Sequence, residues 1–177
     1  MNSPQASAGQ VLDSGSAVHG QGAVIFRRAA PADEPAIRQM ARGERVNPNG
    51  LHWLNFIVAV DGFGLAGAAQ LRPHPGGLHE LGSLLVRQDL RGRQIATRLI
   101  DALMQDRTGR VLMVTRATYA EHYARWGFLP IRPWTAPPSI RRNFLLGQVL
   151  GALHAMAHGR RPVRLAVLDT GPGPRPD

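Results

Sequence analysis

The chain has 177 residues, of which 44% are hydrophobic, enough to fill the core of one ordinary domain. It contains no cysteine, which excludes disulfide frameworks, thiolate zinc fingers and cysteine nucleophiles. The formal net charge is +9 and all 21 basic residues are arginine, but they are spread along the chain, so the charge alone does not indicate a nucleic-acid binder.

The two ends of the chain differ in composition from the middle. Residues 1–22 are rich in Ser, Gly, Gln and Ala and do not resemble a secretory signal, so we expect a disordered leader and a cytoplasmic protein. Residues 170–177 are expected to form a flexible tail, which leaves a single domain at residues 23–169. The longest apolar stretch, residues 144–156, is too short to span a membrane, so we expect no membrane partner.

The first half of the domain alternates apolar runs with turn signals. We expect a helix to begin at Asp33, a favoured capping residue, and to stop at Gly43. Residues 47–50 form a turn cluster, and Asp61-Gly62 separate two apolar runs that we expect to pair as a hairpin. In chain order, the expected elements are a strand at 24–28, a helix at 33–42, and strands at 56–60 and 65–71.

The second half alternates strands with helices. Ile95, Leu99 and Leu103 recur at helical spacing, and Gly127 is a typical helix stop. Hairpin strands followed by this alternation predict an α/β (α+β) fold with a mixed, mostly antiparallel sheet flanked by helices. After a loop at 73–77, the expected elements are a strand at 78–86, a helix from 95 to 104, a strand at 111–114, a short helix at 119–126, a strand from 128, a long helix at 139–158 and a strand at 163–168.

Residues 84–96 pass from a strand through a tight turn into the start of a helix. Such a junction aims backbone N–H groups and the positive end of the helix dipole at one point, which suits a pyrophosphate. Four arginines crowd the junction and can add charge-assisted hydrogen bonds to phosphate. They are Arg87, Arg91, Arg93 and Arg98. An ordinary strand-turn-helix with solvated arginines is the alternative interpretation.

Two motifs here resemble the signatures of the GNAT superfamily of acyl-CoA-dependent N-acyltransferases. Residues 91–96 match the first, which reads Arg or Gln, two residues, Gly, one residue, then Gly or Ala. Residues 119–128 contain the second, which reads Tyr, three residues, Gly-Phe. The resemblance covers about residues 24–135 and implies a GNAT-like fold. Gln94 stands where the family has a glycine, so its side chain must point away from the ligand or hydrogen-bond to it.

The resemblance implies acetyl-CoA as the co-substrate, with its thioester in a gap where two neighbouring strands splay apart. Its pantetheine would pair with backbone groups near the end of the first strand, and an amide there could polarise the thioester carbonyl. By position, the implied cofactor-binding residues are Leu84, Leu85, Val86, Arg91, Gly92, Arg93, Gln94, Ile95, Ala96 and Thr97.

Attack of an amine on a thioester calls for a base and an acid on opposite sides of the carbonyl. Tyr123, four residues before Gly127, stands where the family has a tyrosine that protonates the coenzyme sulfur. Glu80 stands where the histone-acetyltransferase branch has its glutamate base, and regular alternation would set Glu80 and Val86 on one face of the strand. Alternatively, Tyr123 only packs in the core, and Glu80 is solvated or paired with Arg72.

No other chemistry is indicated. His74 and His79 are loosely spaced and lack a His-Glu-x-x-His pattern, so we expect no metal site. No Gly-x-Ser-x-Gly nucleophile motif occurs, which favours direct transfer without a covalent enzyme intermediate. The loop at 45–54 either lines the acceptor pocket or is a turn with a hydrophobic plug. The helix at 139–158 covers the acceptor cleft, forms a homodimer surface or packs as plain core, the last being the usual role of such an apolar stripe.

We therefore expect an N-acetyltransferase that moves an acetyl group from acetyl-CoA to a primary amine of a small molecule by direct attack in a ternary complex. The alternative is a non-catalytic CoA-binding regulatory or interaction module with a GNAT-like fold, to which Gln94 would point. Nucleic-acid binding driven by the charge of +9 has no motif to support it.

Overall fold

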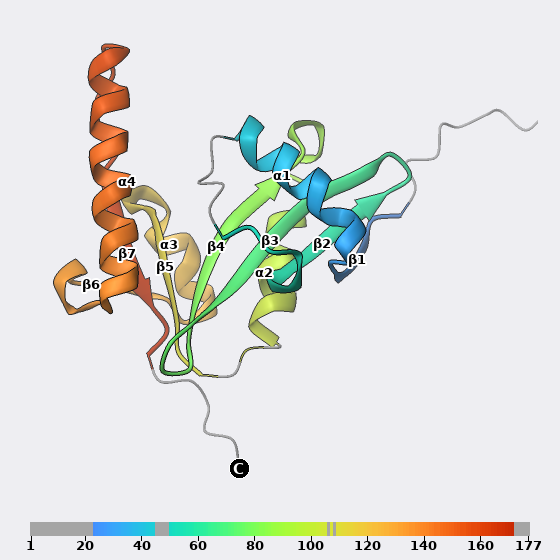
Figure 1. Cartoon of the computed structure of the whole chain (residues 1–177), viewed down its shortest axis with the longest axis horizontal. Coiled ribbons are helices and arrows are strands. Elements are labelled where there is room, and N and C mark those ends of the chain that lie inside the picture. Colours follow the sequence, from blue (N-terminus) through green and yellow to red (C-terminus); the bar gives the residue numbers. More distant parts are fainter. Residues whose placement is uncertain (1–22, 45–49, 106, 108, 172–177) are drawn as a thin grey trace, which may run out of the picture.

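The computed structural model describes residues 23–44, 50–105, 107 and 109–171, and within them the chain forms one sheet of seven strands (Figure 1). The strands are β1 (Ile25–Arg28), β2 (Phe56–Asp61), β3 (Gly64–His74), β4 (Leu78–Val86), β5 (Val111–Arg116), β6 (Leu129–Ile131) and β7 (Leu165–Asp169). They lie in the order β1-β2-β3-β4-β5-β7-β6.

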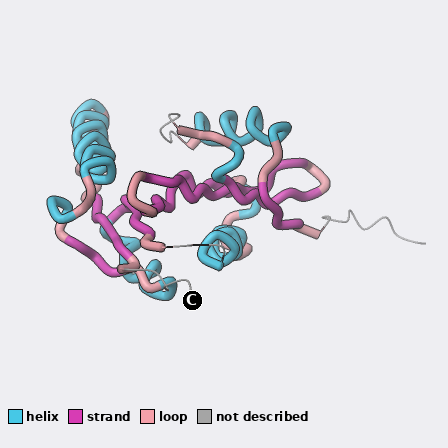
Figure 2. The backbone as a smooth tube through the Cα atoms, turned by 60° about the horizontal axis from the view of Figure 1, so that its bottom comes forward, coloured by secondary structure: helices cyan, strands magenta, loops and turns pink. Residues whose placement is uncertain are grey.

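Helices cover both faces of the sheet. They are α1 (Glu34–Gly43), α2 (Ile95–Gln105), α3 (Ala120–Tyr123) and α4 (Pro138–Ala157). The first and last of these lie on one face, while α2 and α3 lie on the other (Figures 1 and 2). Short 3₁₀ turns extend α3 on both sides, and the whole segment ends at Gly127, whose φ of 80° confirms the predicted stop.

The pairing pattern confirms the predicted mixed, mostly antiparallel sheet. Strands β1 to β4 pair antiparallel in sequence order, and β7 pairs antiparallel with both β5 and β6. The exception is the parallel pair of β4 and β5, which in the described residues has two positions in register, His79 with Val111 and Glu80 with Leu112. Beyond Glu80 the two strands part, so the predicted gap between neighbouring strands is present.

Three groups of buried side chains fill the layers. The largest lies between the sheet and the α2–α3 face and includes Ile95, Leu99, Tyr123 and Phe128. A second group joins α1 to the sheet, and a third packs Ile140 of α4 against the β5–β7 end. These groups attach the helices to the sheet through apolar side chains. The packing thereby fixes where the helices lie relative to β4 and β5.

Some boundaries differ from the predicted ones. Pro73 and His74, predicted as loop, are the last residues of β3, because the hairpin with β4 continues to the pair His74–Leu78. Asp33 precedes α1 as expected, but its carboxylate accepts from the Ala30 amide at 2.7 Å and from Arg27 instead of capping the helix. The predicted leader (1–22), most of the turn cluster (47–50) and most of the tail lie outside the described residues.

The late helix corrects one interpretation. Its apolar stripe is not core, because Leu146, Val149, Leu150 and Leu153 are each more than half exposed. The helix is anchored instead through its opposite side, where Ile140 and Ala155 are buried. Within the part of the chain that the structure describes, no helix has both the length and the apolar character to cross a membrane.

Candidate active site

The turn between β4 and α2 has the backbone shape that the signature motif predicts. After β4 ends at Val86, the chain makes a 3₁₀ turn at Gln88–Leu90 and then passes through two left-handed residues, Gly92 (φ 80°) and Gln94 (φ 60°). The helical hydrogen bonds begin with the Arg98 amide donating to the Gln94 carbonyl at 3.0 Å. The amides of residues 95–97 therefore lie at the N-terminus of α2, where a helix offers donors to an anion.

Gln94 keeps the left-handed conformation that a glycine would adopt there most easily. A side chain in this region costs about 1 kcal/mol or more, so the fold holds this backbone shape against a local preference. The Gln94 side chain is exposed. The backbone cradle is thus present even though the signature glycine is not.

The remaining residues of the predicted coenzyme site follow from this geometry. Ile95 is buried under the sheet, whereas Ala96 and Thr97 are half-buried in the first turn of α2. Arg91, Gly92 and Arg93 are exposed. Arg91 pairs with Glu44 at the end of α1 and donates to the Val86 carbonyl at 3.4 Å, which holds the turn against the end of β4.

Two of the four arginines at the junction are engaged with other side chains. Arg87 is bound to Asp61 at 2.5 Å and Asp89 at 2.9 Å, and these hydrogen bonds raise its pKa further. The Arg98 guanidinium lies 4.1 Å from the centre of the Phe26 ring. With Arg93 they line a pocket of about 260 Å³ beside the β2–β3 hairpin. The sequence could not show that Arg87 is engaged, because Asp61 is 26 residues away.

The end of β4 carries a bulge next to the gap. Ser83 has a φ of 48°, and the register between β3 and β4 shifts between Ala68 and Gln70. Leu84 and Val86 pack with the group under α2, whereas Leu85 is buried with the group under α1. Beyond Glu80, β4 is paired on its β3 side in the described residues, so its other edge is open toward β5.

Tyr123 lies on the α2–α3 face. Its side chain is only 8% exposed and packs edge-on against Phe128, with Trp126 and His122 beside it. Burial raises the pKa of the phenol, and a hydrogen bond from the side chain of Thr115 opposes this in part. A phenol with a raised pKa is protonated at neutral pH, which is the state that a general acid needs.

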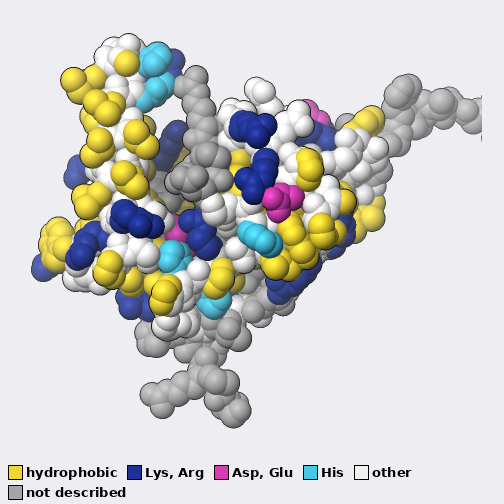
Figure 3. Space-filling view, in the orientation of Figure 1, with side chains coloured by type: hydrophobic (Ala, Val, Ile, Leu, Met, Phe, Trp, Pro, Cys, Tyr) yellow, Lys and Arg dark blue, Asp and Glu magenta, His cyan; other side chains and the backbone are white. Residues whose placement is uncertain are grey.

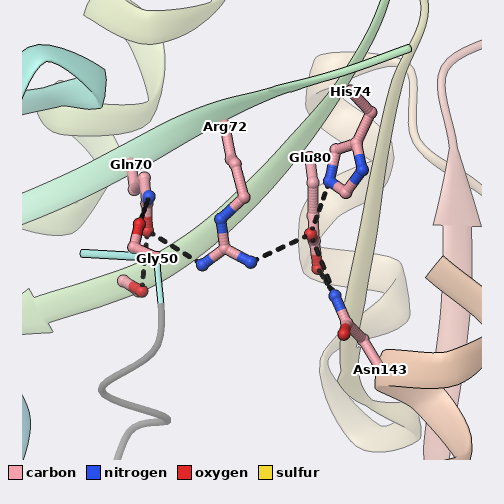
Figure 4. A network of polar contacts seen from close by, with 7 residues as sticks. Gly50, Gln70, Arg72, His74, Glu80 and Asn143 are labelled. Carbon is pink, nitrogen blue, oxygen red and sulfur yellow. Dashed lines mark hydrogen bonds and ion pairs between the residues drawn. The ribbon is translucent and has the colours of Figure 1, made fainter. Parts of the chain in front are cut away.

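Glu80 is the centre of a polar network on the opposite face (Figure 4). Asn143 of α4 donates from Nδ2 to both carboxylate oxygens at 3.2 Å, and the His74 Nε2 lies 2.9 Å from Oε2. Arg72 Nη1 contacts the same oxygen at 3.5 Å. Glu80 is only 8% exposed, so it is not a solvated residue at the end of a strand. The pairing with Arg72, which was the other alternative role, is present.

The network continues from Arg72 to the bulge. Gln70, which is fully buried, accepts from Arg72 at 3.3 Å and from the Ser83 hydroxyl at 3.1 Å, and donates to the Gly50 carbonyl at 2.6 Å. Gly50 belongs to the loop at 45–54, which either lines the acceptor pocket or is a turn with a hydrophobic plug. One buried amide thus connects this loop, the bulge in β4 and the partners of Glu80.

The alternation argument for Glu80 was wrong. The bulge at Ser83 adds one residue to β4, so Glu80 and Val86 do not share a face. Glu80 lies with α4, and Tyr123 lies with α2 and α3. The two candidate catalytic side chains are therefore on opposite faces of the sheet: Glu80 belongs to β4, and Tyr123 interacts with Thr115 of β5.

Sequence reasoning missed most of the residues around Glu80. The sequence did offer one signal, a single glutamine, Gln70, within an apolar run that was predicted as a strand. A buried amide needs hydrogen-bond partners, and Gln70 is fully buried. Asn143, 63 residues from Glu80, gave no signal. Among the described residues, no group of three or more His, Cys, Asp or Glu side chains could hold a metal ion.

Comparison with known proteins agrees with the resemblance. Residues 52–130 match the family model described as an acetyltransferase (GNAT) domain. Among curated proteins, no sequence matches the chain. The matched segment contains β2 to β5, the turn before α2, and both Glu80 and Tyr123.

Solved structures show the same fold at low identity. An N-acetylglutamate synthase from Neisseria gonorrhoeae, complexed with coenzyme A and N-acetyl-glutamate, is 19% identical over 88% of this chain, with a TM-score of 0.62. The chain spans 36% of the length of that enzyme. Rv2747 from Mycobacterium tuberculosis, solved in complex with CoA, is 20% identical over 82% of this chain and 97% of its own, with a TM-score of 0.59.

A third similar structure is an acetyltransferase of the GNAT family from Staphylococcus aureus. It is 11% identical over 83% of this chain and 98% of its own, with a TM-score of 0.56. The fold predicted from the sequence is confirmed by these likenesses.

Proposed function

We propose that this chain, which has the GNAT fold and a GNAT acetyltransferase domain at residues 52–130, is an N-acetyltransferase that moves an acetyl group from acetyl-CoA to a primary amine of a small molecule. The arrangement of Glu80 and Tyr123 on opposite faces of the sheet beside the β4–β5 gap carries the proposal. A thioester held in that gap is open to a base from one face and to an acid from the other.

The binding of acetyl-CoA is supported by the turn and by the open strand edge. The amides of residues 95–97 would receive the pyrophosphate, with Arg91 and Arg93 beside them. The backbone of Leu84, Leu85 and Val86 would pair with the pantetheine along the edge that faces β5. Coenzyme A is present in the similar structures from Neisseria gonorrhoeae and Mycobacterium tuberculosis.

The transfer step uses one proton acceptor and one proton donor. The neutral amine nitrogen attacks the thioester carbonyl carbon, and a backbone amide at the end of β4 stabilises the negative charge on the carbonyl oxygen. As the carbon–sulfur bond breaks, Tyr123 gives its proton to the sulfur. Glu80 takes the excess proton of the amine through water, and the products are an N-acetyl amine and CoA.

The N-acetylglutamate synthase forms, by its name, an N-acetylated amine, which is the reaction type proposed here. The small-molecule acceptor is part of the proposal. A cytoplasmic location, a homodimer, and the exclusion of membrane and nucleic-acid partners stay predictions.

Titration calorimetry with acetyl-CoA, followed by assays of thiol release over a panel of amines, tests the proposal. We expect saturable binding of acetyl-CoA and release of CoA that depends on an amine. Binding without release for any amine would favour the alternative, a CoA-binding regulatory or interaction module.

A further inference from the structure

We infer that the acceptor amine carries an extended apolar substituent, which lies along the flank of α4 that begins at Asn143. The inference rests on the proposed acetyl transfer at Glu80 and names the class of its acceptor: a primary amine with an alkyl or aryl chain.

Asn143 fixes α4 beside the proposed reaction centre. Its amide donates to both oxygens of Glu80, and Glu80 is the residue at which β4 and β5 stop pairing. The helix therefore borders the gap from its first turns onward. An acceptor whose amine approaches Glu80 has this side of α4 as its nearest helical wall.

Two leucines continue the Asn143 flank up the helix. Leu146 and Leu150 follow at three and seven residues, the spacing that repeats one side of an α-helix. They are 51% and 64% exposed, so their surface is free to bind an apolar group. In the space-filling view, apolar side chains run along α4 (Figure 3).

The other sides of α4 point elsewhere. Gln148 accepts from the Leu165 amide, and a Cβ at Gly147 would meet the Leu165 side chain at 2.9 Å, so this side packs on β7. Leu145 and Met156 lie roughly opposite to Asn143 by helical spacing and are 55% and 79% exposed. They supply a matched pair of exposed apolar residues that do not face the gap.

The chemistry of the helix selects an apolar substituent over a charged one. Residues 143–157 contain no Asp, Glu, Lys or Arg. Beyond Arg142, a second ammonium or a carboxylate on the acceptor would find no counter-ion on this wall, whereas an alkyl chain would cover exposed leucine surface. Each methylene that is fully buried strengthens binding by about fourfold.

The first test compares butylamine with octylamine as acceptors for the full chain and acetyl-CoA. We expect kcat/KM for octylamine to exceed that for butylamine by at least about tenfold, since four further methylenes can contact α4. Equal values for the two amines would overturn the inference.

The second test uses two double variants of the same helix. In L146Q/L150Q, which keeps side-chain length and a good helix former, the preference for octylamine should fall about tenfold, with KM for acetyl-CoA unchanged. In the control L145Q/M156Q the preference should stay. Equal loss in both variants, accompanied by the same change in sedimentation, would show that α4 is a surface between two copies of the chain and would overturn the inference.

Failure of the acceptor class is distinguishable from failure of the proposed function. Turnover with every amine but without a preference for chain length would contradict the apolar acceptor and leave the proposed acetyl transfer in place. If no amine releases CoA, the binding of octylamine and butylamine to the CoA-loaded protein is compared by calorimetry. Tighter binding of octylamine that L146Q/L150Q weakens would support the apolar site. Equal binding of the two amines would overturn the inference.

Discussion

Glu80 and Val86 lie on the same strand, yet their side chains are on opposite faces of the sheet. The cause is the bulge at Ser83, whose hydroxyl donates to the buried Gln70. Before the bulge, the carboxylate of Glu80 therefore points toward α4. After it, the side chain of Val86 packs under α2. One strand supplies both a polar site and a wall of the main core.

Glu80→Gln removes the carboxylate charge while keeping the side-chain size. Because the proposed base would be lost, we expect turnover to fall by about 10²–10⁴ with acetyl-CoA binding nearly unchanged. Steady-state kinetics and calorimetry measure the two quantities. Glu34→Gln is the control, since Glu34 pairs with Arg38 on α1 and should keep full activity. Normal turnover in Glu80→Gln, with lower stability, would make Glu80 a structural ion pair only.

Tyr123→Phe removes the proposed acid and leaves the ring packing in place. We expect kcat to fall by about 10²–10⁴ while the affinity for acetyl-CoA stays within error of the wild type. The matched control is Tyr119→Phe, because Tyr119 is 50% exposed and should be replaceable without effect. Unchanged turnover in Tyr123→Phe would contradict the role given to this phenol.

The same tyrosine predicts a pH dependence of stability. Its pKa in the folded state is raised above the ordinary value of 10.0, so the folded protein binds this proton more tightly than the unfolded chain does. The stabilisation is fully present below pH 10 and is lost as the pH rises through the folded pKa. Urea unfolding between pH 8 and 11 should show this loss in the wild type and a smaller one in Tyr123→Phe. Identical pH profiles would argue against a buried, neutral phenol.

Gln94→Gly should improve the turn before α2. Gln94 has a φ of 60°, and glycine adopts this conformation without a Cβ penalty, so we expect a gain of up to about 1 kcal/mol in unfolding free energy. Acetyl-CoA should also bind more tightly, because no side chain would stand beside the pyrophosphate. Thermal unfolding and calorimetry measure both effects. Gln88→Gly, at a residue with negative φ, should instead lower stability, and a similar loss in Gln94→Gly would refute the strain argument.

The elements that the sequence predicted well are those with a local cause. The passage from the turn into α2 follows from Gly92 and from the helical spacing of Ile95 and Leu99. Its backbone shape persists despite Gln94. Local pattern was sufficient there because each feature depends on residues within a few positions of one another.

The features that could not be predicted depend on distant partners or on one inserted residue. A bulge at Ser83 reverses the alternation without a marker in the neighbouring residues, and Arg87 is committed to Asp61 across the sheet. The stripe on α4 correctly indicated an apolar helix side. Spacing alone does not say whether that side meets the core, and here the opposite side does.

The short pairing of β4 with β5 has a consequence for hydrogen exchange. In the described residues, the backbones of the two halves of the sheet, β1–β4 and β5–β7, are in register at His79–Val111 and Glu80–Leu112. Beyond these pairs, amides on the facing edges have no strand to protect them and should exchange with deuterium faster than those between β2 and β3. A ligand chain that lies between the two edges would slow this exchange on both strands at once. Exchange at these amides therefore measures whether the gap is occupied.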